Sequence, residues 1–183
     1  IKSFNKLFLR DFKCNYYMDG LGNTAKDFYE TIEFIRNNIS ERKYKNVYAI
    51  GSSSGGFAAI LFGNLLKFKK VLAFNPQTVL TEERELVIQD NYLDLRACNE
   101  LRKKKKEDDY FNKCLNLKNL IPFQTQVEIH YSELSKIEKN YAEFIKHKNC
   151  KLINYKTSTH LLAYELREEG KLKNIILNFL NSN

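Results

Sequence analysis

Residues 47–62 have the sequence VYAIGSSSGGFAAILF, in which an apolar run, a turn of small residues and a second apolar run follow one another. The first run is typical of a buried strand and the second of a buried helix. The turn between them, from Gly51 to Gly55, has the Gly-x-Ser-x-Gly pattern of a nucleophile elbow, in which a strained backbone exposes the central serine. Glycines at both ends permit the close approach that such a turn requires. The stretch therefore predicts Ser53 as a nucleophile, against the alternative of a Gly/Ser loop that caps a helix without chemistry.

The rest of the chain alternates between strand-like and helix-like segments. Strands are expected at 6–12, 46–50, 70–74, 125–131 and 151–155, and helices at 24–40, 56–66, 135–145, 161–166 and 171–180. Such alternation predicts an α/β fold, with a mostly parallel sheet of about five strands and helices on both faces. The length of 183 residues fits a single domain over 1–183.

Residues 79–120 interrupt this alternation. They are rich in charge and contain helix-like fragments at 83–90, 94–105 and 109–115, with no clear strand. Long insertions in compact domains are often functional. We expect a helical insertion that acts as a lid.

A serine hydroxyl needs a base to accept its proton, and the chain has three histidines. His130 lies inside an expected strand, and His147 lies at a charged helix end. His160 follows the last expected strand in a small polar loop, and the carboxyl ends of parallel strands open at one edge of the sheet. By elimination and topology His160 is the predicted base, although a loop histidine that caps the next helix is the structural alternative.

The third member of a triad would orient the imidazole from the loop after the strand that ends near Tyr131. Glu133 is the only carboxylate of that loop and is the predicted acid. Glu138 is the alternative acid, although the spacing Ser135-x-x-Glu138 also predicts a capping box that would give it a structural role. The order serine, acid, histidine along the chain agrees with that of serine hydrolases that carry a nucleophile elbow.

An oxyanion hole needs two main-chain donors directed at the carbonyl oxygen of the substrate. The N–H of Ser54, directly after the nucleophile, is the first predicted donor. The second is expected from the loop after the first strand, where Phe12 lies.

Composition excludes several classes of protein. A hydrophobic content of 43% indicates a folded globular chain. The sequence contains no run of 18 apolar residues, so it predicts no membrane span. Four scattered cysteines (Cys14, Cys98, Cys114 and Cys150) without a C-x-x-C pair favour reduced thiols in a cytoplasmic protein. We expect no metal and no organic cofactor.

The net charge of +8 includes a basic run at 102–106, which three acidic residues follow at 107–109. Basic runs can bind nucleic acid, but this one has no interleaved aromatic residues and no recognised module, so a solvated surface is favoured.

The first residues lack both an initiator Met and a signal-peptide pattern. We expect a processed or excised piece, which allows for a neighbouring domain lost from the N-terminus.

Through the elbow at Ser53, the later acidic loop and His160, the chain resembles the α/β-hydrolase superfamily over nearly its whole length outside the insertion. Three segments also resemble small hydrolase-like proteins associated with bacterial surface-polysaccharide synthesis. They are YYMDGL at 16–21, GSSSGGFAAILFG at 51–63 and AFNPQT at 73–78. The resemblance implies an esterase, with an O-acyl group on a sugar as substrate, or an acyltransferase with the same triad.

The sequence also departs from the pattern of that superfamily. Two strands that usually precede the first expected strand are missing, and Arg10-Asp11 replaces the usual His-Gly. The acid loop lacks the usual Gly-x-x-Asp form, and Ser135 stands near the position of the Asp. A hydrolase-shaped interaction module with a decayed site is therefore a third alternative.

Overall fold

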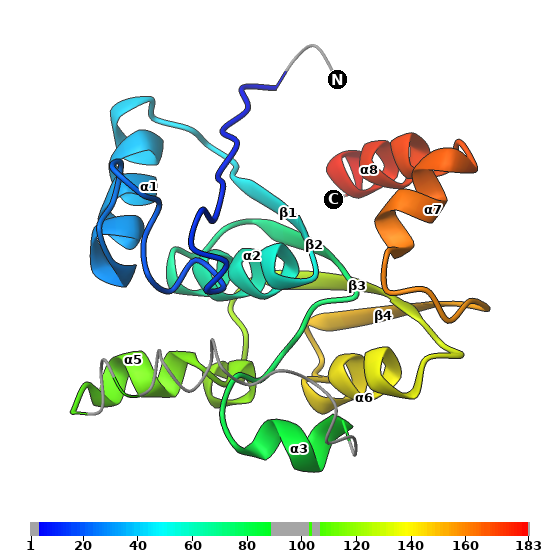
Figure 1. Ribbon diagram of the computed structural model, residues 1–183. Coiled ribbons are helices and arrows are strands. Elements are labelled where there is room, and N and C mark those ends of the chain that lie inside the picture. Colours follow the sequence, from blue (N-terminus) through cyan, green and yellow to red (C-terminus); the bar gives the residue numbers. More distant parts are fainter. Residues whose placement is uncertain (1–3, 89–102, 104–106, 183) are drawn as a thin grey trace.

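The computed structural model describes residues 4–88, 103 and 107–182 (Figure 1). Its sheet contains β1 (Tyr48–Ser52), β2 (Lys70–Phe74), β3 (Gln126–Ser132) and β4 (Cys150–Tyr155). All neighbouring pairs are parallel and the spatial order is β1-β2-β3-β4. The predicted α/β class with a parallel sheet is confirmed.

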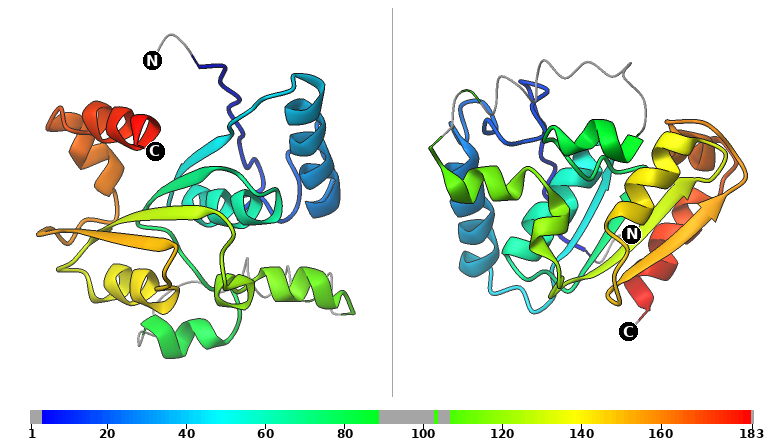
Figure 2. Two further views of the ribbon diagram at one scale, coloured as in Figure 1. Left: turned by 180° about the vertical axis from the view of Figure 1, so that it is seen from behind. Right: turned by 90° about the horizontal axis from the view of Figure 1, so that it is seen from below.

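Helices cover both faces of the sheet, as predicted (Figures 1 and 2). One face carries α1 (Phe28–Glu41), α2 (Ser54–Leu65) and α6 (Lys136–Phe144), and the other carries α7 (Leu162–Glu168) and α8 (Leu172–Asn181). β2 shows the two layers most clearly, because Val71 and Ala73 join the core of the first face while Leu72 and Phe74 join that of the second. Side chains alternate along a strand, so a fully buried strand needs apolar residues at both sets of positions.

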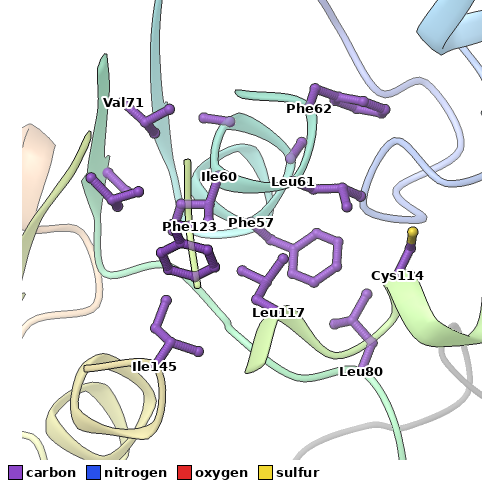
Figure 3. Packing of buried hydrophobic residues seen from close by; sticks show 14 of the residues in the cluster. Phe57, Ile60, Leu61, Phe62, Val71, Leu80, Cys114, Leu117, Phe123 and Ile145 are labelled. Atoms are coloured by element: carbon purple, nitrogen blue, oxygen red, sulfur yellow. The ribbon is translucent and has the colours of Figure 1, made fainter. Parts of the chain in front are cut away.

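The larger core lies around α2, whose buried residues run without a break from Gly56 to Gly63. Figure 3 shows Phe57, Ile60 and Leu61 of this helix among side chains from β2, from both ends of the 79–120 segment and from the residues that follow that segment. A helix that is apolar on all sides must be buried on all sides. This packing fixes the helix that begins directly after Ser53.

The sheet has four strands rather than about five, because the predicted strand at 6–12 does not form. That segment begins near β1, since the Phe4 and Tyr48 rings are 6.4 Å apart, but it makes no ladder with β1. Leu7 and Phe8 are 52% and 88% exposed, so few of its apolar side chains find a layer to pack against. An apolar run without such a layer gains little from strand pairing.

The insertion predicted at 79–120 is described in part. Its described elements are α3 (Glu83–Ile88), α5 (Asp109–Cys114) and the 3-10 helix η1 (Leu117–Leu120). An isolated antiparallel bridge joins Val79 to Asn116 at its base, and α3 packs against α6. The expected fragment at 94–105, Cys98 and most of the basic run at 102–106 lie outside the described residues. That the insertion acts as a lid stays a prediction.

Burial governs the two cysteines that face the core. Cys114 and Cys150 are free thiols, and burial raises the pKa of each to about 12. Such thiols stay protonated near neutral pH and are poor nucleophiles. The exposed Cys14 is also free.

None of the helices in the described part of the chain has the length and apolar character needed to cross a bilayer.

Gly51 has no room for a side chain, because a Cβ at this position would overlap the carbonyl oxygen of Gly55. We expect Gly51→Ala to lower the free energy of unfolding by about 2 kcal/mol or more, since the overlapping atoms are backbone and cannot move aside. Urea denaturation measures this change.

Gly55→Ala is the matched control. A Cβ at Gly55 would meet only the Tyr17 hydroxyl, at an ordinary contact distance of 3.8 Å. It lies in the first turn of α2, where Ala favours the helix over Gly. Equal losses of stability in the two variants would contradict the elbow geometry.

Candidate active site

Ser53 lies at the sharp turn between β1 and α2. Its backbone has φ 54° and ψ −122°, a conformation that non-glycine residues rarely adopt and that costs about 1–3 kcal/mol. The turn is held by the Ser53 N–H, which donates to the carbonyl oxygen of Phe74 at the end of β2 (2.9 Å). Strain of this size persists only where the surrounding structure fixes it. The expected elbow conformation is present.

The parallel sheet brings the far end of the chain to this turn. In the strand register Ser52 pairs with Phe74, and Ser132 pairs with Tyr155, so all four strands end at one edge. The loop after β4 leads to His160 at that edge. The Oγ of Ser53 and the Nε2 of His160 are 2.9 Å apart, across 107 positions of sequence. A hydroxyl at this distance can pass its proton to a neutral imidazole.

The other ring nitrogen of His160 meets Glu138. Its Nδ1 lies 2.7 Å from Oε1 of Glu138, a carboxylate that is 6% exposed, whereas the His160 side chain is 43% exposed. Glu133, the first-choice acid from the sequence, is not brought to His160. Its Oε1 accepts a hydrogen bond from the side-chain amide of Asn154 (3.2 Å) instead. The structure corrects the expected contact and gives it to the alternative, Glu138.

The capping box explains why the sequence placed Glu138 second to Glu133 as the expected partner of His160. The Ser135 side chain does cap α6, and it accepts from the Glu138 N–H (3.4 Å). In a full capping box the Ser135 N–H would donate to the Glu138 carboxylate. Here this N–H donates to the carbonyl oxygen of Ser132 instead (3.2 Å). The Glu138 carboxylate, which lies in the first turn of α6 rather than in the loop before it, is therefore available to His160.

The Glu138 carboxylate raises the pKa of His160 above its ordinary value of 6.5, first by its hydrogen bond and then by its charge, while burial of the ring opposes the rise. A carboxylate at Nδ1 also fixes the tautomer, since the proton on Nδ1 leaves Nε2 as the acceptor toward Ser53. The arrangement is that of a base held ready to accept a serine proton.

The remaining histidines have structural surroundings, in line with the sequence interpretation. His130 is 3% exposed and lies between the Tyr155 hydroxyl (2.7 Å at Nδ1) and Glu128 (2.8 Å at Nε2). His147 accepts from the Asn149 N–H (3.3 Å).

The donors predicted for an oxyanion hole lie on two segments. Ser54 is the first residue of α2, and N–H groups in the first turn of a helix have no partner within it. The loop that contains Phe12 approaches the elbow through Tyr17, and the Asp11 carboxylate orders it by accepting the N–H groups of Lys13 (3.1 Å) and Tyr17 (2.9 Å). That the Phe12 N–H is the second donor stays a prediction.

Comparison with known proteins supports the fold. The sequence matches no family model and no curated protein. The structure is similar to the capsule O-acetyltransferase of Neisseria meningitidis serogroup A, with a TM-score of 0.59 and 17% identity over 90% of this chain and 68% of that one. It is also similar to a carboxylesterase from the thaumarchaeon Nitrososphaera gargenis (TM-score 0.53, 15% identity, 87% and 73% covered) and a hydrolase from Oleispira antarctica (TM-score 0.51, 15% identity, 84% and 72% covered). The chain has an α/β-hydrolase-like fold.

Proposed function

We propose that this protein is a serine-dependent acyl-ester enzyme in which Ser53 is the nucleophile, His160 the base and Glu138 the acid that orients His160. One observation carries the proposal: Ser53, His160 and Glu138 form a continuous hydrogen-bonded series, with heavy-atom distances of 2.9 and 2.7 Å, at a strained strand-to-helix turn. A nucleophile, a base within reach of it and a third group that orients the base together define this kind of site.

In the proposed reaction the Ser53 proton moves to Nε2 of His160 while Oγ bonds to the carbonyl carbon of the ester. The negative charge on the carbonyl oxygen meets the Ser54 N–H and the second donor predicted at Phe12. The alcohol leaves with the proton from His160, and an acyl group remains on Ser53. A water molecule then gives a proton to His160 and attacks the acyl carbon. The bond from this carbon to Oγ of Ser53 breaks, His160 returns the proton to Oγ, and a carboxylic acid is released.

The proposed substrate is a carboxylic ester, with an O-acyl group on a sugar as the favoured case. Support comes from the sequence resemblance to proteins of surface-polysaccharide synthesis and from the fold shared with a capsule O-acetyltransferase. The exposure of His160 agrees with an alcohol portion that extends outside the protein. We keep the cytoplasm as the predicted location, on the pattern of the cysteines.

Acyl transfer is the second candidate. A sugar hydroxyl would replace water in the second half of the reaction, with the same residues and the same acyl-serine. The structural neighbour that acts as an O-acetyltransferase has also been solved with CoA, which makes acetyl-CoA the reasonable donor to test. The decayed-site alternative predicts that Glu133 and His160 do not meet, and they do not, because Glu133 contacts Asn154. What speaks against that alternative is the contact between Ser53 and His160 (2.9 Å), with Glu138 at the other ring nitrogen of His160 (2.7 Å).

Product analysis tests the proposal and separates its two forms. The protein is incubated with p-nitrophenyl acetate or acetyl-CoA, with and without an oligosaccharide as acceptor. We expect acetate release from the ester in water. O-acetylated sugar that forms at the expense of acetate would identify the transferase. No release and no transfer with either donor, from folded protein, would contradict the proposal.

A further inference from the structure

Asn75 occupies the carboxyl end of β2, between the strand that leads to Ser53 and the strand that leads to α6. It is fully buried, at 0% exposure, and its φ of 39° lies in the left-handed region. Asn tolerates that region better than most residues do, though at some cost. Its N–H donates to the carbonyl oxygen of His130 on β3 (2.9 Å). A buried polar side chain in this backbone conformation must be well satisfied by partners.

The partners of the Asn75 side chain lie in the loop that carries the base. Its Nδ2 is within hydrogen-bond distance of the carbonyl oxygens of Thr159 (2.9 Å) and His160 (3.0 Å) and of Oγ of Ser132 (3.1 Å). Its Oδ1 accepts from the Ser132 N–H (2.9 Å). The Ser132 hydroxyl in turn donates to the Thr159 carbonyl oxygen (2.6 Å). One amide thus joins the ends of β2 and β3 to the main chain of His160 itself.

We propose that Asn75 is the positioning residue of His160: its buried amide holds the 159–160 main chain so that the imidazole reaches Ser53 and Glu138 together. The consequence for catalysis rests on the proposed function, whereas the placement of the imidazole does not. His160 is half-exposed and projects from a loop, so its own packing restrains it weakly. Beside the ring contacts to Glu138 and Ser53, the restraint acts on its backbone, through Asn75 and Ser132.

Asn75→Gly removes the amide and leaves a residue that accepts a positive φ without strain. We expect kcat for an ester substrate to fall by about 10²-fold with little change in KM, because a small displacement of a catalytic group has this effect on the chemical step. We also expect the pKa of His160 to fall, since its hydrogen bond to Glu138 is the main cause of its rise. NMR of histidine-labelled protein measures this pKa, with the resonance assigned by comparison with His160→Ala.

Thr125→Ala is the matched control. Thr125 is 1% exposed, and its hydroxyl donates to the Gly63 carbonyl oxygen (2.8 Å) at the opposite end of β3. This variant also loses a buried side-chain-to-backbone hydrogen bond, so it should lose stability while kcat and the His160 pKa keep their wild-type values. Folded Asn75→Gly with the wild-type kcat and His160 pKa would overturn the inference.

Ser132→Ala covers the case in which Asn75→Gly does not fold. It removes a smaller part of the same network, and we expect kcat to fall about tenfold, the value of one hydrogen bond, together with a lower His160 pKa. Unchanged values in this variant would equally overturn the inference. If the wild-type protein neither hydrolyses nor transfers an acyl group from either donor, the proposed function fails, while the His160 titration still decides the role of Asn75.

Discussion

Ser53→Ala is expected to remove ester turnover almost completely, with kcat lowered by at least about 10⁴-fold, because the proposed acyl intermediate forms on the Ser53 hydroxyl. His160→Ala should cost nearly as much, since the Ser53 hydroxyl then has no base within reach. Steady-state kinetics on a p-nitrophenyl ester measures both losses. Neither change disturbs the core, because both side chains lie outside the buried clusters.

The double variant sharpens this test. Residues that act as one unit give losses that do not add, so Ser53→Ala with His160→Ala should be about as inactive as either single variant. Urea midpoints close to that of the wild type would show that the fold is intact. Losses that multiply in the double variant would contradict a shared proton transfer between Ser53 and His160.

Glu138→Gln is expected to lower kcat by about 10²- to 10⁴-fold, as the loss of the orienting carboxylate does in triads of this kind. His160 must be neutral to act as a base, so its raised pKa places the acidic limb of the pH–rate profile above 6.5. Removal of the Glu138 charge lowers that pKa, and the limb should move to lower pH while the plateau falls. A pH–rate profile of kcat/KM measures both changes.

Glu133→Gln is the matched control for Glu138→Gln. Glu133 lies in the loop that leads from β3 to the helix of Glu138, but its carboxylate meets Asn154 rather than His160. The rate and the acidic limb of this variant should stay close to those of the wild type. A large loss in Glu133→Gln together with an active Glu138→Gln would reverse the assignment of the acid.

The sequence predicted the elbow turn, and the proximity of His160 to it, from a short motif and from the order of the elements. A Gly-x-Ser-x-Gly turn between a strand-like and a helix-like run is a short-range signal, and the strained backbone of Ser53 agrees with it. His160 followed from elimination among three histidines and from the common edge of parallel strands. Both inferences needed only the order of the elements.

The features that the sequence missed depend on contacts between distant elements. Pairing of residues 6–12 with β1 required a layer of side chains over Leu7 and Phe8, which the sequence does not reveal. The capping-box pattern at Glu138 correctly predicted the start of α6. It could not show that Ser132 takes the Ser135 N–H and leaves the carboxylate to His160. Asn75 belongs to the resembling segment AFNPQT at 73–78, but the resemblance gave it no role and the sequence does not show which main-chain groups its side chain meets.

Covalent labelling of Ser53 tests the central claim most directly. The folded protein is treated with a fluorophosphonate, and the modified residue is located by peptide mass spectrometry, with Ser53→Ala and His160→Ala as controls. The account predicts one adduct, on Ser53, that is absent from the first control and greatly slowed in the second. An adduct on another residue, or none on folded wild-type protein, would contradict it.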